Sequence, residues 1–433
     1  MKRFLSLLLM CLMVLSFVPV VQAETDITEL TFYYPVTVSG ALQQLMDQIC
    51  QDFNVLNPDI KINMVYTGTY DDNIVKLQTA IQGNTAPDFW VSLYNHKYTF
   101  KALNAIASMN DLVAKDGGND YLNDFIPTFL ADSYLDGELI SIPFMRSSQL
   151  LYYNKDAFKE VGLDPERSPV TWDELVEYAQ KLVIKDGNGN VSRYGIGYSE
   201  NFGNLQFPFT ANSVQNSADG SNMFSPDGAQ VFIDTPENIE VLQFWMDVKQ
   251  KYGISPEGIV QFKDLPTLFF DNQLAIMYNT SGNMRHVLDN APFEVGIAAM
   301  PYTKRPATVT GGGNFYISNS ISPERQEKVW RFIRYATSPE VQAQWFVDTG
   351  YVAARKSSFD TDVLKTYIEQ YPAVQVAREQ VEFAFPELSS YECAKIWRIL
   401  SDNVQAALIG DKTAAEALAD AQVESNETLE KYQ

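Results

Sequence analysis

The chain has 433 residues, of which 46% are hydrophobic and 20% are charged. This is the composition of a globular protein, and the length is too great for a single compact core. The formal net charge of −22 at pH 7 argues against nucleic acid and anionic lipid as partners. Aromatic side chains make up 13%, so flat surfaces for stacking remain available after the core has taken most of them.

The first 23 residues have the order of a signal peptide. Lys2 and Arg3 precede an apolar stretch over residues 4–18, and Val21-Gln22-Ala23 supplies small residues for cleavage. We therefore expect an exported protein, periplasmic or extracellular, with the signal peptide cleaved after Ala23. Loss of Lys2 and Arg3 would take the net charge from −22 to −24.

The segment that follows predicts a strand, a helix and a second strand. Apolar residues alternate over residues 30–34 and again over residues 60–66, which is the period of a strand. Between them, residues 42–56 place apolar side chains on one helical face, and Asn57-Pro58 ends the helix. A strand–helix–strand unit of this kind predicts a parallel sheet.

Later segments continue the alternation of short strands and helices. Residues 139–143, 150–153, 273–278 and 295–300 are expected as strands, the first two near a crossover between domains. Helix starts are marked by capping boxes at Thr171–Glu174 and Thr413–Glu416, and by prolines at the first helical position after Thr235, Ser322 and Ser338. The order predicts an α/β protein with a mainly helical C-terminal third.

No catalytic or metal-binding motif has the required spacing, so neither an enzyme nor a cofactor is expected. His96 and His286 are the only histidines, and each is expected to be structural or exposed. Asp186, Asn188 and Asn190 resemble the start of a calcium loop, but the twelfth position is Gly197, which favours a turn. Cys50 and Cys393 either pair or remain as two buried thiols, and the sequence leaves both possibilities open.

Several motifs together resemble the family 1 extracellular solute-binding proteins of ATP-binding-cassette (ABC) importers. They are residues 83–88 (GNTAPD), 151–158 (LYYNKDAF), 162–165 (GLDP), 171–175 (TWDEL), 311–314 (GGGN) and 349–351 (TGY). Their order and spacing cover nearly the whole mature chain. The likeness is greater to the glycerol-3-phosphate-binding members than to the maltose-binding members.

The resemblance implies a two-lobed periplasmic-binding-protein-like fold (type II), with a ligand cleft between lobes that are joined by crossing segments. We expect the N-lobe to hold residues 24–145 and 302–337, and the C-lobe to hold residues 146–301 and 338–433. Hinged lobes of this kind close around a ligand. The implied partners are a small sugar-like ligand and the membrane permease subunits of an ABC transporter, and the protein is expected to be a monomer.

The resemblance also implies a set of ligand-binding residues. They are Tyr70, Tyr94, Arg146, Ser147, Asn201, Phe202, Ser281, Gly312, Tyr351, Trp397 and Arg398. Each could instead serve the core or a turn. Two departures weaken phosphate recognition: residues 199–204 lack the tryptophan pair of the glycerol-3-phosphate-binding members, and Arg398 follows the position, Trp397, at which their arginine is expected.

We therefore expect the ligand to be an uncharged sugar or oligosaccharide. The alternative within the same fold is glycerol-3-phosphate or a glycerophosphodiester, because Arg146 on the crossover could replace the missing cation. An alternative of a different class is a secreted carbohydrate-active enzyme, because acidic residues are plentiful although no pair stands out. A sensing protein that docks on a membrane receptor would share the fold.

Overall fold

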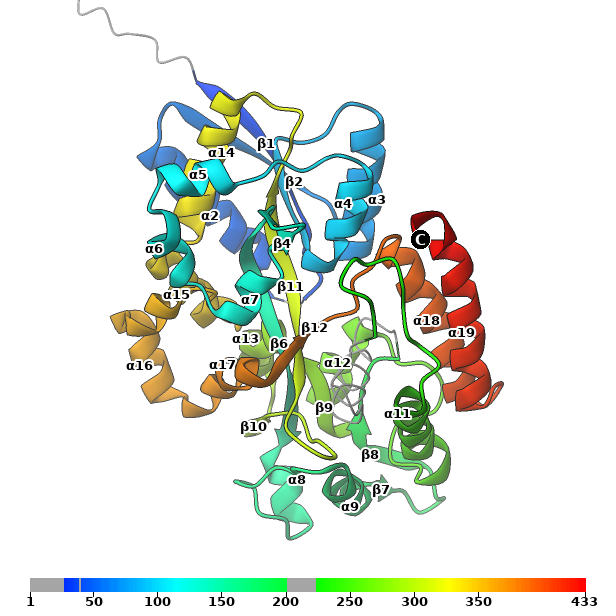
Figure 1. Ribbon diagram of the computed structural model, residues 1–433. Coiled ribbons are helices and arrows are strands. Elements are labelled where there is room, and N and C mark those ends of the chain that lie inside the picture. Colours follow the sequence, from blue (N-terminus) through cyan, green and yellow to red (C-terminus); the bar gives the residue numbers. More distant parts are fainter. Residues whose placement is uncertain (1–26, 39, 201–222) are drawn as a thin grey trace, which may run out of the picture.

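The computed structural model describes residues 27–38, 40–200 and 223–433 (Figure 1). Its centre is a sheet of ten strands in the order β2-β1-β3-β11-β6-β9-β8-β7, with β10 beside β6 and β12 beside β11. The α/β class expected from the sequence is confirmed. The strands are β1 (Thr28–Tyr34), β2 (Ile60–Tyr66), β3 (Phe89–Leu93), β6 (Ile142–Asn154), β7 (Ile184–Lys185), β8 (Val191–Gly197), β9 (Leu274–Thr280), β10 (Val295–Ala298), β11 (Thr308–Ile317) and β12 (Ala384–Pro386), with β4 (Tyr134–Leu135) and β5 (Glu138–Leu139) forming a separate hairpin.

Helices cover the sheet along most of the described chain. They are α2 (Leu42–Leu56), α3 (Tyr70–Gln82), α4 (Lys97–Ala102), α5 (Asn110–Lys115), α6 (Gly118–Asn123), α7 (Pro127–Ala131), α8 (Lys155–Glu160), α9 (Trp172–Leu182), α11 (Pro236–Met246), α12 (Leu265–Phe270), α13 (Met284–Asn290), α14 (Pro323–Ala336), α15 (Pro339–Thr349), α16 (Asp362–Gln370), α17 (Val376–Glu379), α18 (Cys393–Leu408) and α19 (Ala414–Leu429). A short 3-10 turn, η4 (Ser281–Asn283), follows β9. None of the helices in the described ranges is long and apolar enough to cross a membrane.

The strand–helix–strand unit predicted over residues 30–66 is confirmed. β1 and β2 pair in parallel from Thr28↔Ile60 to Tyr34↔Tyr66, and α2 connects them. The amide N–H of Asn57 donates to the carbonyl of Phe53 at the C-cap of α2, where the sequence predicts the helix end. β3 then joins β1 in parallel on its other side. This half of the sheet lies in the upper part of Figure 1.

Residues 150–153 are a strand as expected, but residues 139–143 are not a separate strand, because Leu139 ends β5 and Pro143 belongs to one long strand, β6, over Ile142–Asn154. Pro143 suggests a break, since proline cannot donate to a neighbouring strand. In the structure Pro143 lies at an irregularity, where the register with β11 shifts between Gly313 and Asn314, so the strand continues. β6 pairs with β11 as far as Ser148 and with β9 from Gln149 onwards. It therefore connects the two halves of the sheet.

The buried apolar side chains of the described residues form a large cluster, a second cluster and a smaller third one. The large cluster joins β1, β3 and β11 to α2 and α14, and it continues through α15. The second cluster is built on β8, β9, α9, α11, α18 and α19. The third lies around Trp90, Phe100 and Tyr316 beside α3 and α4. α14, within the predicted 302–337 part of the N-lobe, packs on α2.

α15 bears on the division into lobes, because it follows the predicted boundary at residue 338. It packs against α2 and α14 as well as α13, and the Trp345 ring stacks on Phe144 of β6 at 5.3 Å. Since α15 contacts elements of both proposed lobes, its packing does not by itself fix the boundary at residue 338. The lobe ranges 24–145 with 302–337 and 146–301 with 338–433 remain a prediction.

Candidate functional site

The first part of the candidate site is a pair of buried tyrosines, Tyr70 and Tyr351. Tyr70 is the first residue of α3, which begins there because Thr69 and Asp72 form a capping box. Tyr70 is 9% exposed, and its hydroxyl interacts with the Tyr351 side chain but makes no hydrogen bond of regular geometry to any described residue. Burial and then the neighbouring Tyr351 hold the pKa of Tyr70 well above its ordinary value. Burial likewise raises the pKa of Tyr351.

Two glycines make room for these rings. A Cβ on Gly313 would lie 2.9 Å from the Tyr70 hydroxyl, and a Cβ on Gly282 would lie 2.9 Å from Cζ of Tyr351. Larger side chains at either position would displace the tyrosines. The glycine run on β11 and the turn η4 therefore meet α3 and the segment after α15 at one place.

Ser147, Ser281 and Gly312 lie next to the tyrosine pair. Ser147 of β6 is buried and pairs with Gly311 of β11. The hydroxyl of Ser281 accepts a hydrogen bond from the amide N–H of Ser148 at 3.2 Å. Gly312 has a φ of +94°, and a Cβ there would lie 1.8 Å from the Met145 carbonyl, so only glycine fits. The structure thus brings Tyr70, Ser147, Ser281, Gly312 and Tyr351 together from distant parts of the sequence.

Arg146 lies in the same region, but every N–H group of its guanidinium donates to an acceptor within the protein. Its five N–H donors bond from Nε to Gly311 O (3.1 Å), from Nη1 to Phe129 O (3.4 Å) and Asn314 Oδ1 (3.2 Å), and from Nη2 to Asp132 Oδ2 (2.8 Å) and Thr310 Oγ1 (2.9 Å). The guanidinium carbon lies 4.2 Å from the Tyr94 ring and 4.8 Å from the Phe129 ring. No donor of Arg146 is left for a phosphate, so the suggestion that it replaces a missing cation is corrected.

Tyr94 belongs to the same internal network. It is fully buried, its hydroxyl donates to Thr310 O at 3.0 Å, and it accepts from the amide N–H of Glu387 at 2.6 Å. Tyr94 therefore positions Arg146 and the 386–391 segment rather than offering a free hydroxyl.

Sequence reasoning missed Glu387, because no local motif marks a buried carboxyl after a short edge strand. Its side chain is 4% exposed, and Asn95 Nδ2 donates to one carboxyl oxygen at 3.0 Å. Burial raises the pKa of Glu387 well above its usual range, against the opposing effect of Arg146.

Trp397 and Arg398 lie on α18, which is at the right of Figure 1 beside α19. Trp397 is partly buried and its indole N–H donates to Leu388 O at 3.2 Å. Arg398 is exposed and close to Asp71 of α3: desolvation and Asp72 raise the pKa of Asp71, and Arg398 opposes that rise. Arg398 therefore lies near the start of the helix that begins with Tyr70. Asn201 and Phe202 lie outside the described residues.

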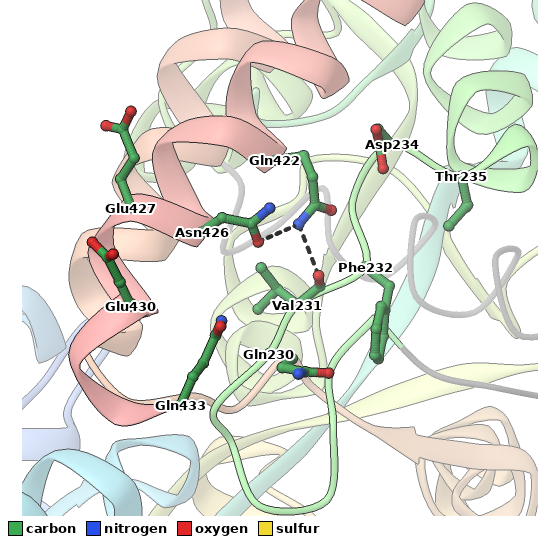
Figure 2. A pocket seen from close by; sticks show the side chains of 10 residues that line it. All are labelled: Gln230, Val231, Phe232, Asp234, Thr235, Gln422, Asn426, Glu427, Glu430 and Gln433. Atoms are coloured by element: carbon green, nitrogen blue, oxygen red, sulfur yellow. Dashed lines mark hydrogen bonds between the residues drawn. The ribbon is translucent and has the colours of Figure 1, made fainter.

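Two hollows in the described part of the chain lie away from these residues. The larger, of about 720 Å³, lies between α19 and residues 230–235 (Figure 2). There Gln422 donates to Val231 O and to Asn426 Oδ1, which fixes the segment on the helix. The smaller, of about 410 Å³, is lined by residues 168–170, 297–307 and 376–383. None of the predicted ligand-binding residues that the structure describes lines either hollow.

The other chemistry-bearing groups have local structural roles. The Asp186 carboxylate accepts from the amide N–H groups of Asn188 and Asn190, which confirms a turn. Burial lowers the pKa of His96 to about 3, and its Nδ1 is 3.0 Å from the Ser92 hydroxyl. Cys50 and Cys393 are free and buried. No group of three or more potential metal ligands occurs in residues 27–38, 40–200 and 223–433.

Comparison with known proteins gives a consistent picture. Residues 48–374 match the family described as bacterial extracellular solute-binding protein. The sn-glycerol-3-phosphate-binding periplasmic protein UgpB of Escherichia coli (strain K12) is 28% identical over 427 residues, covering 94% of both chains.

Two solved structures show the fold. UgpB from Mycobacterium tuberculosis, in complex with glycerophosphocholine, has a TM-score of 0.80 at 22% identity and covers 94% of this chain and 99% of its own. Maltose-bound MalE3 of T. maritima has a TM-score of 0.78 at 22% identity and covers 94% of this chain and 100% of its own. The architecture is therefore the two-lobed α/β fold of periplasmic binding proteins.

Proposed function

Since the chain belongs to the bacterial extracellular solute-binding protein family, we propose that it captures a small polyhydroxylated solute and delivers it to the permease subunits of an ABC importer. The ligand is a sugar or a sugar-like polyol held at the Tyr70–Tyr351 pair, between the two halves of the sheet. The protein acts as a monomer outside the cytoplasmic membrane, after cleavage of the signal peptide behind Ala23. The mature N-terminus of the exported protein, read by mass spectrometry, tests the cleavage site.

The buried hydroxyl of Tyr70 carries this proposal. A buried hydroxyl without a partner costs free energy, and a ligand hydroxyl placed beside it would remove that cost. Ser147, Ser281 and the backbone at Gly312 supply further donors and acceptors within the same cluster. Aromatic rings beside hydroxyls suit a sugar, whose C–H faces are apolar and whose hydroxyls both donate and accept.

Arg398 favours a second candidate, in which the solute carries a phosphate. The Arg398 guanidinium is exposed and lies near Asp71, which follows Tyr70 in the sequence. The N–H donors of Arg146, in contrast, are all bonded to acceptors within the protein. A charge-assisted bond from arginine is the usual requirement for a phosphate. The glycerol-3-phosphate-binding relative and the glycerophosphocholine complex support this candidate. The named relatives bind solutes, which supports a role without catalysis.

A binding panel separates the candidates. Calorimetry against maltose, maltotriose, sn-glycerol-3-phosphate and glycerophosphocholine should show binding to one chemical class. If a phosphorylated polyol binds, Arg398→Gln should lower its affinity by about tenfold or more, because bonds to charged groups contribute about 1.5–3 kcal/mol. If a neutral sugar binds, Arg398→Gln should have little effect. Hydrolysis products from any of these compounds would instead indicate an enzyme.

A matched pair of variants tests the site. Tyr70→Phe removes a hydroxyl that makes no hydrogen bond of regular geometry within the protein, so it should lower ligand affinity about fivefold or more while changing the stability to urea little. Tyr94→Phe removes a hydroxyl that both donates and accepts within the protein, so it should lower stability by about 1–3 kcal/mol. Full ligand affinity in Tyr70→Phe would reject the site, and binding of no compound in the panel would reject the proposed ligand classes.

A further inference from the structure

Tyr98 of α4 is held by a segment far away in the sequence. Its hydroxyl donates to the carbonyl of Pro226 at 2.7 Å, and its side chain is 3% exposed. Gly228 lies against the Tyr98 ring with a φ of +72°, and a Cβ there would meet three ring carbons at 2.8 Å. The bare backbone of the 225–230 turn is therefore fitted to this ring.

Tyr391 completes the contact from the other direction. Its amide N–H donates to Gly228 O at 3.0 Å, and its ring lies 5.3 Å from the Tyr98 ring. It also stacks on Tyr432, near the end of the chain, at 4.2 Å and 10°. We call Tyr98, Pro226, Gly228, Tyr391 and Tyr432 the tyrosine clasp.

The clasp joins two separate hydrophobic clusters. Tyr98 belongs to the small cluster around Trp90 and Tyr316, beside β3 and β11. Met223 and Val231, at the two ends of the segment that carries Pro226 and Gly228, belong to the cluster of α11, α18 and α19. Because the small cluster is built around β3, α4 and β11 and the other around β8, β9, α11, α18 and α19, a motion that separates α4 from α11 and α19 would break the clasp.

We propose that the tyrosine clasp stabilises the closed arrangement of the two halves, and that Tyr98, Gly228 and Tyr391 thereby position the ligand site without touching the ligand. The proposal rests on the proposed function only where it concerns ligand release. None of the clasp residues is among the proposed ligand-binding residues. The clasp therefore affects ligand affinity indirectly, by changing the fraction of molecules in the closed arrangement. The apparent dissociation constant is the intrinsic constant divided by that fraction, so loosening the clasp weakens binding and speeds release.

Tyr98→Phe tests this directly, because it keeps the ring and removes only the bond to Pro226. Small-angle scattering of the ligand-free protein should give a larger radius of gyration for the variant than for the wild type. Stopped-flow measurement with a solute identified in the binding panel should give a dissociation rate raised about fivefold, the change that one net hydrogen bond corresponds to. Gly228→Ala, whose methyl group would press on the ring, should act in the same direction.

Tyr121→Phe is the matched control. Its hydroxyl is 2.9 Å from the Thr337 hydroxyl, and both residues lie on the α6–α14 side of the large cluster. It should lower stability without changing the ligand-free radius of gyration or the dissociation rate. An unchanged radius and an unchanged dissociation rate in Tyr98→Phe would overturn the proposal. The scattering arm needs no ligand, so failure of the clasp and failure of the proposed ligand class give different results.

Discussion

The two arginines predicted to face the ligand, Arg146 and Arg398, differ in what surrounds them. Arg146 is completely buried and ion-paired with Asp132 at 2.8 Å, whereas Arg398 is exposed. We predict that Arg146→Leu lowers the free energy of unfolding by about 3–5 kcal/mol, because it leaves the Asp132 carboxylate buried without its partner. Urea denaturation measures this change.

Arg398→Leu is the matched control for that measurement. An exposed side chain of this kind should change the free energy of unfolding by no more than about 0.5 kcal/mol. Equal losses of stability in the two variants would contradict the structural role assigned to Arg146.

Glu387 gives a pH-dependent prediction. Burial raises the pKa of Glu387 well above its usual value, while Arg146 lowers it and Asp132 raises it. The unfolded chain releases this proton near pH 4.3. Above that pH the native state binds more protons than the unfolded state, so this group makes stability fall as pH rises towards the folded pKa.

Glu387→Gln removes the titrating group and keeps an oxygen that can accept from Asn95. The variant should therefore gain stability relative to the wild type as the pH is raised from 5 to 8. Urea unfolding at both pH values measures the difference. A difference that stays constant or shrinks with pH would mean that Glu387 is ionised in the native protein.

At the residue scale, the sequence predicts which residues lie together at the site, but it does not predict the hydrogen bonds that each of them makes. Tyr70, Ser147, Ser281, Gly312 and Tyr351 follow from motifs along the chain, and the structure brings them together. The sequence does not show that every N–H donor of Arg146 is bonded within the protein, because the acceptors lie up to 168 residues away along the chain. Nor does any local pattern show that Tyr94 is bonded within the protein while Tyr70 is not.

At the scale of elements, the start of α19 provides a prediction with an internal control. Thr413 Oγ1 accepts from the Glu416 amide at 3.2 Å, and the Glu416 carboxylate accepts from the Thr413 amide at 2.9 Å. Thr413→Ala should therefore cost about 1 kcal/mol in the free energy of unfolding.

Ser338 occupies the same N-cap position in α15, but its side chain makes no capping hydrogen bond. Ser338→Ala should accordingly change stability by less than about 0.5 kcal/mol. Thermal or urea unfolding of both variants checks the difference, and equal losses would show that the box at Thr413 adds nothing.

These caps also explain which elements the sequence predicts well. Helix starts depend on side chains within three residues, so the signals at Thr235, Ser322 and Thr413 predict α11, α14 and α19 correctly. The continuity of β6 depends instead on pairing with β11 and β9, which are more than 100 residues away. The capping box predicted at Thr171–Glu174 is half formed: the Glu174 amide N–H donates to Thr171 Oγ1, but the Glu174 carboxylate accepts from the Val170 amide N–H and not from that of Thr171.

At the scale of the whole molecule, the proposed ligand-binding residues come from both halves. Tyr70 lies on α3, which packs on β3, whereas Ser281 follows β9 and Arg398 lies on α18. A ligand that touches both halves has more contacts when they are together, and it shifts the equilibrium by that difference in affinity. The proposed lobes should therefore approach each other when the ligand binds.

We predict that a saturating solute lowers the radius of gyration measured by small-angle scattering. At about a hundred times its dissociation constant the same solute should raise the free energy of unfolding by about 2.7 kcal/mol.

The tyrosine clasp changes the expected size of this decrease. If the clasp keeps part of the ligand-free population closed, the ligand-free wild type has a smaller radius of gyration than ligand-free Tyr98→Phe. The ligand-induced decrease in the radius of gyration should therefore be larger in the variant. Stabilisation without any decrease in radius, in both proteins, would mean that the solute binds a site that does not depend on closure.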